Sequence, residues 1–220
     1  MPLCFDLDGT LGSFGGGYLL LRETLAEAWG SPVERADLES CAGSTDWEIV
    51  DELHRARFGR GLGENDYAAF ESACLAKFER TFHPEGRAPL PHAGLIEGLR
   101  LLLDRGHELW LVSGNTPKVL DFKAEALKLD PRIHRLGSLP HHDRAGLIRH
   151  ALERGPAPDL YAGDRPHDRD AAAQAGVPFL AVGDAVPGPH PILAPHAEAE
   201  ALVETIERLL HGWRPSPTAS

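Results

Sequence analysis

Short apolar runs alternate with amphipathic segments along most of the chain, and the two patterns predict different elements. The apolar runs are typical of buried strands and cover residues 3–6, 108–113, 133–136, 160–163 and 177–182. Apolar positions at helical spacing predict helices over residues 95–103, 118–127, 144–152, 168–175 and 198–210. Single helices between successive strands imply right-handed crossovers, so the pattern predicts an α/β fold with an open, Rossmann-like parallel sheet.

Residues 18–82 break this alternation, because their apolar positions recur at helical spacing throughout and no strand is evident. Pro84, Pro89 and Pro91 then mark a linker. We therefore predict an all-helical domain over residues 14–85, inserted after the first strand of a core formed by residues 1–13 and 86–220. The glycine-rich residues 13–17 are expected to act as a hinge, and residues 213–220 to fray.

Charge and cysteine content narrow the class of protein. The 220 residues contain 22 Lys and Arg against 33 Asp and Glu, a formal net charge of −11, which disfavours binding to nucleic acid or to an anionic membrane. The three cysteines are far apart and odd in number, so a disulfide framework is not expected. No signal peptide or membrane-spanning stretch is apparent, and we expect a cytoplasmic protein.

Polar residues follow three of the predicted strands, where open parallel sheets bind their ligands. Asp6 and Asp8 come directly after the first strand, although Asp8-Gly9 is also an ordinary turn sequence. Ser113, Gly114 and Asn115 lead into a helix, an arrangement that binds phosphate oxygens but also matches a plain N-cap. For each of these two motifs taken alone, both the ligand-binding and the structural interpretation remain open.

The third strand end carries Asp164 and Asp168, four residues apart at a strand-to-helix turn. Carboxylate oxygens are the ligands that Mg²⁺ prefers, usually together with water and substrate phosphate. The alternative is structural, with Asp164 capping the helix and Asp168 favouring the helix dipole.

The three motifs together, in this order and spacing, strongly resemble those of the haloacid dehalogenase superfamily of phosphatases. Residues 6–11 match its first motif, a strand followed by Asp-x-Asp-Gly-Thr-Leu, without departure. Ser113 fits the second motif, while Asp164 and Asp168 fit the Gly-Asp-x-x-x-Asp of the fourth. The helical block also falls where this family inserts a cap domain, so the resemblance spans essentially the whole chain.

The resemblance implies a Mg²⁺-dependent phosphatase that works through an aspartyl-phosphate. Asp6 would be the nucleophile and Asp8 the general acid and base. Mg²⁺ would be held by Asp6, the backbone carbonyl of Asp8, Asp164 and Asp168. Phosphate would be bound by Thr10, Ser113, Gly114, Asn115 and the cation of the third motif.

That third motif is where the chain departs from the family, which normally has a lysine there. We favour Arg144 as its occupant and keep Lys118 as the alternative. Arginine keeps the positive charge and binds phosphate with two donors, but its geometry differs from that of lysine.

The predicted cap favours a small phosphate ester as substrate, for example phosphoglycolate or a sugar phosphate. Residues 43–46 of the cap are either a substrate-contacting loop or simply a capping box at the start of a helix. Arg55, Arg57 and Arg60 could meet a substrate carboxylate, but such arginines more often form a solvated helix face. A monomer or a homodimer is expected.

Two other functions are alternatives to the phosphatase. A phosphomutase of the same superfamily would use the same aspartyl-phosphate, and a catalytically silent protein would only bind phosphate. The second acid, Asp8, argues against both the silent protein and a true dehalogenase, which in this superfamily lacks that acid and needs no metal.

Overall fold

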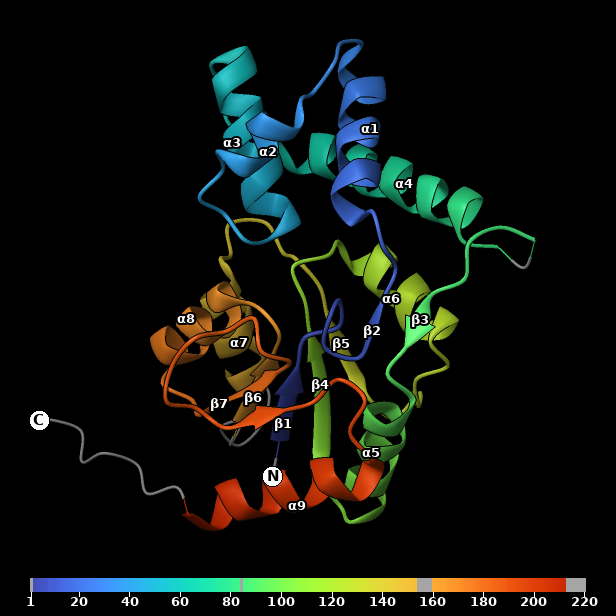
Figure 1. Ribbon diagram of the computed structural model, residues 1–220. Coiled ribbons are helices and arrows are strands. Elements are labelled where there is room, and N and C mark those ends of the chain that lie inside the picture. Colours follow the sequence, from blue (N-terminus) through green and yellow to red (C-terminus); the bar gives the residue numbers. More distant parts are fainter. Residues whose placement is uncertain (1, 84, 154–159, 213–220) are drawn as a thin grey trace, which may run out of the picture.

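The computed structural model describes residues 2–83, 85–153 and 160–212 (Figure 1). A sheet of six parallel strands has the order β5-β4-β1-β6-β7-β8. Its strands are β1 (Pro2–Phe5), β4 (Glu108–Val112), β5 (His134–Leu136), β6 (Leu160–Gly163), β7 (Phe179–Val182) and β8 (Ile192–Leu193). The predicted parallel α/β sheet is therefore confirmed, and only the two-residue edge strand β8 was not foreseen.

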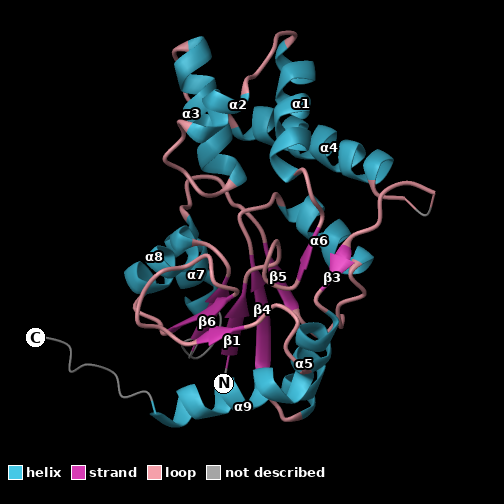
Figure 2. Cartoon of the chain, in the orientation of Figure 1, coloured by secondary structure: helices cyan, strands magenta, loops and turns pink. Residues whose placement is uncertain are grey.

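Helices cover both faces of this sheet, and each corresponds to a predicted helix (Figure 2). They are α5 (Ala93–Asp104), α6 (Pro117–Ala126), α7 (Arg144–Glu153), α8 (Pro166–Ala175) and α9 (Ala199–Gly212). None of the helices in the described part of the chain is long and apolar enough to cross a membrane.

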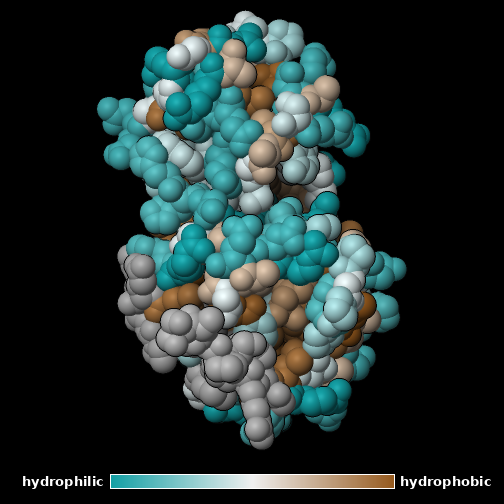
Figure 3. All heavy atoms as spheres, turned by 90° about the vertical axis from the view of Figure 1, so that its left-hand side faces the viewer, coloured by the Kyte–Doolittle hydropathy of each residue, from teal (hydrophilic) through white to brown (hydrophobic). Residues whose placement is uncertain are grey.

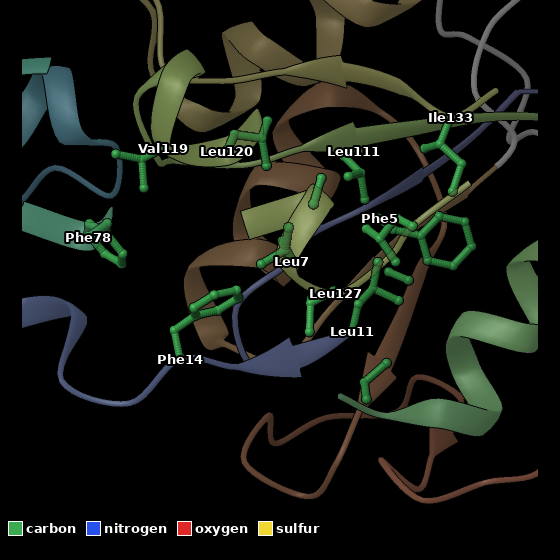
Figure 4. Close-up of a cluster of buried hydrophobic side chains, with 14 of the residues drawn as sticks. Phe5, Leu7, Leu11, Phe14, Phe78, Leu111, Val119, Leu120, Leu127 and Ile133 are labelled. Atoms are coloured by element: carbon green, nitrogen blue, oxygen red, sulfur yellow. The ribbon is translucent and has the colours of Figure 1, made fainter. Parts of the chain in front are cut away.

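Alternation along the strands divides the core into two layers. Leu3 and Phe5 of β1 pack in one cluster with residues of α5, α6 and α9, whereas Cys4 packs in another with residues of α7 and α8. Successive side chains of a strand point to opposite faces, so a strand covered on both sides is apolar throughout. Figure 4 shows part of the first cluster, including Phe5, Leu11 and Leu127.

The helical insertion lies above the carboxyl ends of the strands (Figure 1). It consists of α1 (Gly17–Trp29), α2 (Arg35–Glu39), α3 (Asp46–Phe58) and α4 (Glu64–Thr81). These helices follow the first strand, as predicted, and they lie within residues 14–85, although those exact domain bounds remain a prediction. On the face shown in Figure 3, the surface over these helices is mostly hydrophilic.

A small two-stranded antiparallel sheet joins the insertion to the core. Its strands are β2 (Gly12–Ser13) and β3 (Leu90–Pro91), where the sequence predicted only a hinge and a linker. Two-residue strands leave no periodic signal, because a single pair of positions cannot show alternation. The predicted frayed tail, 213–220, lies outside the described residues.

The close packing of α5 against α9 leaves no room for a side chain at Gly98. A Cβ atom at this position would lie 2.8 Å from Leu202 Cδ2 and 3.0 Å from the carbonyl oxygen of Ala199. We expect Gly98→Ala to lower the free energy of unfolding by about 1–3 kcal/mol through overpacking, despite the better helix propensity of alanine.

Gly17→Ala is the matched control, because a Cβ atom there would meet nothing within 4 Å. This variant should be neutral or stabilised by up to about 1 kcal/mol. Urea unfolding measures both changes. Wild-type stability in Gly98→Ala would show that the two helices are not closely packed at this point.

Candidate functional site

The three polar strand ends meet at one edge of the sheet, beneath the insertion. Asp6 follows β1, Ser113 follows β4 and Asp164 follows β6, and these strands are neighbours in the sheet. The backbone N–H of Asp6 donates to the carbonyl oxygen of Ala162 at 2.8 Å, which extends the β1–β6 pairing as far as the carboxylate. The backbone of Asp6 is thus hydrogen-bonded to the neighbouring strand in the same way as the strand residues before it.

Three carboxylates converge here and could hold a metal ion. One oxygen each from Asp6, Asp164 and Asp168 lie within 4.8 Å of one another. Asp6 is 5% exposed and Asp168 is fully buried. A set of oxygen ligands alone suits a hard divalent cation such as Mg²⁺.

Gly9 allows this convergence. Its backbone φ of +87° is one that residues with a side chain rarely adopt. A Cβ atom at this position would also lie 2.1 Å from Asp164 Oδ2. Thr10 supports the same carboxylate, because its fully buried hydroxyl donates to Asp164 Oδ1 at 3.4 Å. The structure thus places Thr10 beside the predicted metal ligands and not in the lining of the pocket, and its phosphate contact stays a prediction.

Arg144 lies among the carboxylates at the start of α7. Its Nη1 is 3.0 Å from Asp6 Oδ1 and 3.0 Å from Asp168 Oδ1, and it also contacts the Tyr161 hydroxyl at 3.3 Å. Nε is buried and has no hydrogen-bond partner among the described residues. Lys118, the alternative, instead pairs with Glu71 at 3.1 Å on the exposed side of α6. Of the two cations, only Arg144 reaches Asp6.

The Asp8 side chain contacts a different set of residues from the three clustered carboxylates. Its Oδ2 accepts from Asn115 Nδ2 at 2.7 Å and from Lys123 Nζ at 2.6 Å. Asn115 Nδ2 also donates to Ser113 Oγ at 2.8 Å. The Asp8 carboxylate therefore does not join the other three, and the predicted contact of its backbone carbonyl with a metal stays a prediction.

A pocket of about 360 Å³ opens between this edge of the sheet and the insertion, and its lining includes Asp6, Asp8, Ser113, Asn115 and Arg144. Gly114 also lines it, and a Cβ atom there would lie 2.6 Å from the Ser44 carbonyl oxygen and 2.7 Å from Arg144 Nη2. The insertion, the second strand end and Arg144 thus meet at a glycine.

The sequence model of the haloacid dehalogenase-like hydrolases matches residues 3–173, most of the chain. The chain belongs to this family. No curated protein sequence matches it. The family assignment rests on the match and agrees with the fold and with the three strand-end motifs.

Solved structures of this fold superpose over most of the chain. A hydrolase from Pseudomonas syringae is 22% identical, with 82% of this chain and 84% of that one covered and a TM-score of 0.62. A predicted phosphatase from Clostridium acetobutylicum is 19% identical, with 94% and 98% covered and a TM-score of 0.62. A predicted phosphoglycolate phosphatase from Haemophilus somnus is 19% identical, with 92% and 96% covered and a TM-score of 0.58. At these identities the likeness concerns the fold.

Lys123 and Tyr161 belong to the site but were not predicted. Lys123 is 2% exposed and lies with its ammonium group over the rings of Phe78, at 4.7 Å, and Phe14, at 5.3 Å. A lysine within the apolar stripe of Leu120, Ala124 and Leu127 was a signal that could have revealed it. Tyr161 gave no signal, because an aromatic residue inside a strand is indistinguishable from core.

Residues 43–46 of the insertion include the predicted capping box, while their contact with a substrate stays a prediction. Thr45 caps α3 and forms a capping box with Glu48, as the structural reading proposed. In addition, Ser44 and Asp46 line the pocket. Arg55, Arg57 and Arg60 do not line it, since Arg55 pairs with Asp51, Arg60 with Asp66, and Arg57 lies over Trp29. The solvated-face reading of these arginines is the one that the structure supports.

Burial and mutual repulsion raise the pKa values of the clustered carboxyl groups. Burial and then Asp168 raise the pKa of Asp6 to about 7, although Arg144 opposes the shift. Burial and then Asp6 raise the pKa of Asp164 to about 6, and burial also raises the pKa of Asp168. A divalent cation would relieve this repulsion, so the residues present fit a metal site.

These shifts predict how stability depends on pH when a chelator removes divalent cations. The pKa of Asp6 rises from 3.8 to about 7 on folding, so between these values the folded chain binds more protons than the unfolded chain. The Asp6 contribution to stability therefore falls as the pH rises through this window. We expect Asp6→Asn to be more stable than the wild type at pH 7.5, by a margin that shrinks toward pH 4.5.

Urea unfolding in chelator at both pH values measures this margin. Asp184→Asn serves as the control, because Asp184 is exposed, and it should follow the wild type at both pH values. Excess Mg²⁺ should also narrow the margin, since the cation stabilises the wild-type carboxylates. A difference in the free energy of unfolding between Asp6→Asn and the wild type that does not change with pH would contradict the raised pKa of Asp6.

Proposed function

We propose that this protein is a Mg²⁺-dependent phosphatase that hydrolyses a small phosphorylated metabolite through an aspartyl-phosphate on Asp6. The observation that carries the proposal is that Asp6 and Asp8 line one pocket but face different partners. Asp6 lies beside Arg144 and the two other carboxylates that could hold a metal ion, Asp164 and Asp168. Asp8 lies beside Asn115 and Lys123. Two carboxylates in such different surroundings suit the separate tasks of nucleophile and proton carrier.

In the first step, Asp6 attacks phosphorus and the bond from phosphorus to the leaving oxygen breaks. Asp8 donates a proton to that oxygen, so the product leaves as an alcohol. In the second step, Asp8 takes a proton from water, the water oxygen attacks phosphorus, and inorganic phosphate is released from Asp6. Asn115 and Lys123 hold the Asp8 carboxylate in one orientation throughout.

The phosphoryl oxygens would be bound by Arg144, Ser113 and the backbone around Gly114 and Asn115. Asp6, Asp164 and Asp168 would hold Mg²⁺ together with the carbonyl of Asp8. The cation would neutralise charge on the phosphoryl group, which is the main requirement of phosphoryl transfer. The pocket of about 360 Å³ suits a small ester better than a polymer.

The first test is phosphate release from a panel of phosphorylated metabolites and one aryl phosphate, with Mg²⁺ or with chelator. Turnover should require Mg²⁺ and should fall by about a thousandfold or more in Asp6→Asn, because that variant lacks the nucleophile. Release of phosphate at the same rate from Asp6→Asn would contradict the mechanism. Transfer of phosphate to a second position of a sugar phosphate, in excess of hydrolysis, would identify a phosphomutase instead.

A second test separates the two candidate cations of the third motif. Arg144→Met should lower kcat about a hundredfold to a thousandfold, because it removes a charged donor from the phosphoryl site. Lys118→Met, which removes the same charge from the outer side of α6, should leave kcat/KM nearly unchanged. Arg144→Lys keeps the charge and should recover part of the activity.

Far-ultraviolet circular dichroism and urea unfolding of each variant show whether the fold is retained. A loss in Lys118→Met with full activity in Arg144→Met would overturn the assignment.

A further inference from the structure

The wall of the pocket that belongs to the insertion differs in character from the wall formed by the core. Leu21, Ile49 and Phe78 line it with apolar surface, and Phe14 of the connecting segment adds an aromatic ring (Figure 4 labels Phe14 and Phe78). The charged side chain among the insertion residues that line the pocket is Asp46, a carboxylate. The leaving group of a bound phosphate ester would face this wall, because the phosphoryl group occupies the strand ends.

Asp46 is held in place by the core. Its Oδ2 accepts from the backbone N–H of Thr116 at 2.8 Å, and its own N–H donates to the carbonyl oxygen of Gly114 at 2.7 Å. Burial raises its pKa to about 6, with the Thr116 hydrogen bond and Lys123 acting in the opposite direction. At neutral pH the group is a partly desolvated carboxylate that gains from a hydrogen-bond donor or a positive charge.

The cations around the pocket are already engaged by protein groups. Lys123 donates to Asp8 and Asn115 and lies under the Phe14 and Phe78 rings. Arg144 is shared between Asp6, Asp168 and the Ser44 carbonyl oxygen. His167 also lines the pocket, and its Nε2 lies 3.7 Å from Asp168 Oδ1.

Arg165, at the edge of the pocket, pairs with Asp164 at 3.1 Å and is mostly exposed. A second anionic group on the substrate would therefore find the Asp46 carboxylate, while the cation that lies against the rings of this wall, Lys123, is already bound to Asp8 and Asn115.

We propose that Asp46 and the apolar wall select phosphate esters whose leaving group is uncharged or cationic and carries a hydroxyl or ammonium donor, and that they reject esters with a carboxylate. This inference rests on the proposed phosphatase activity and narrows its substrate class. It disfavours phosphoglycolate, because none of the described arginines of the insertion lines the pocket to meet the carboxylate of that compound.

Three esters of one two-carbon skeleton test the charge preference directly. Phosphoglycolate ends in a carboxylate, 2-hydroxyethyl phosphate in a hydroxyl and O-phosphoethanolamine in an ammonium group. The two latter esters should each be hydrolysed with a kcat/KM at least about tenfold above that of phosphoglycolate, the size of effect expected from one partly buried charge. A kcat/KM for phosphoglycolate equal to or above the other two would overturn the proposal.

Asp46→Asn shows whether Asp46 is responsible. Asparagine keeps the volume and an oxygen acceptor for Thr116 but removes the charge, so the preference for ammonium over carboxylate should narrow by about tenfold. Hydrolysis of 2-hydroxyethyl phosphate serves as an internal check that the site is intact. Glu79→Gln removes one charge from an exposed position of α4 outside the pocket and should leave the preference unchanged.

An unchanged preference in Asp46→Asn, or a preference that Arg165→Met abolishes instead, would contradict the assignment to Asp46.

Binding of the three esters to Asp6→Asn in the presence of Mg²⁺, measured by calorimetry, separates this inference from the proposed function. If the wild type hydrolyses none of the esters but the variant binds the ammonium and hydroxyl esters more tightly than phosphoglycolate, the phosphatase fails and the charge preference stands. If hydrolysis occurs and phosphoglycolate binds most tightly, the phosphatase stands and the charge preference fails.

Discussion

The guanidinium group of Arg144 is the interaction on which the rest of the site depends. Asp6 and Asp168 come from segments far apart in sequence, and both are buried with their charges close together. Arg144 Nη1 lies 3.0 Å from each of them, while Nη2 donates to the Ser44 carbonyl oxygen of the insertion at 2.9 Å. Without this cation, the buried carboxylates would have to take up protons or separate.

The same group of contacts connects the insertion to the core. The N-terminus of α3 rests on the second strand end through Asp46, and the N–H of Trp47 donates to Ser138 Oγ at 2.9 Å. The Tyr67 hydroxyl of α4 donates to the carbonyl oxygen of Ser138 at 3.2 Å. The residues proposed to bind the phosphoryl group, 113–115, therefore include Gly114 and adjoin Thr116, both of which contact the insertion. A ligand in the pocket would then act directly on the contact between the insertion and the core.

The sequence predicted the parts of the site that follow from topology. Asp6, Ser113 and Asp164 end adjacent parallel strands, so their proximity follows from strand order alone. The position along the chain favoured Arg144 over Lys118 without excluding Lys118, because only tertiary packing turns Lys118 outward to Glu71. Lys123 reaches the pocket from a helix whose orientation is set by tertiary contacts, so its place in an apolar stripe could mark it as buried but not show what it faces. Asp46 lies within residues 43–46, which the sequence offered as one of two alternatives, and only the packing of the insertion brings it to the pocket. Strands β2, β3 and β8 have two residues each and are below the length at which periodicity is visible.

The charge balance of the pocket explains why a metal and a phosphate should bind together. Five carboxylates of the described residues, Asp6, Asp8, Asp46, Asp164 and Asp168, lie in or beside the pocket with three cationic side chains, Arg144, Lys123 and Arg165. A phosphate ester adds further negative charge to a region whose carboxyl groups already resist ionisation. A divalent cation compensates for most of that charge, so each ligand favours the other through their mutual attraction and through relief of the same repulsion. If the site works as proposed, the raised carboxyl pKa values mean that it would bind an anion well only when a cation accompanies it.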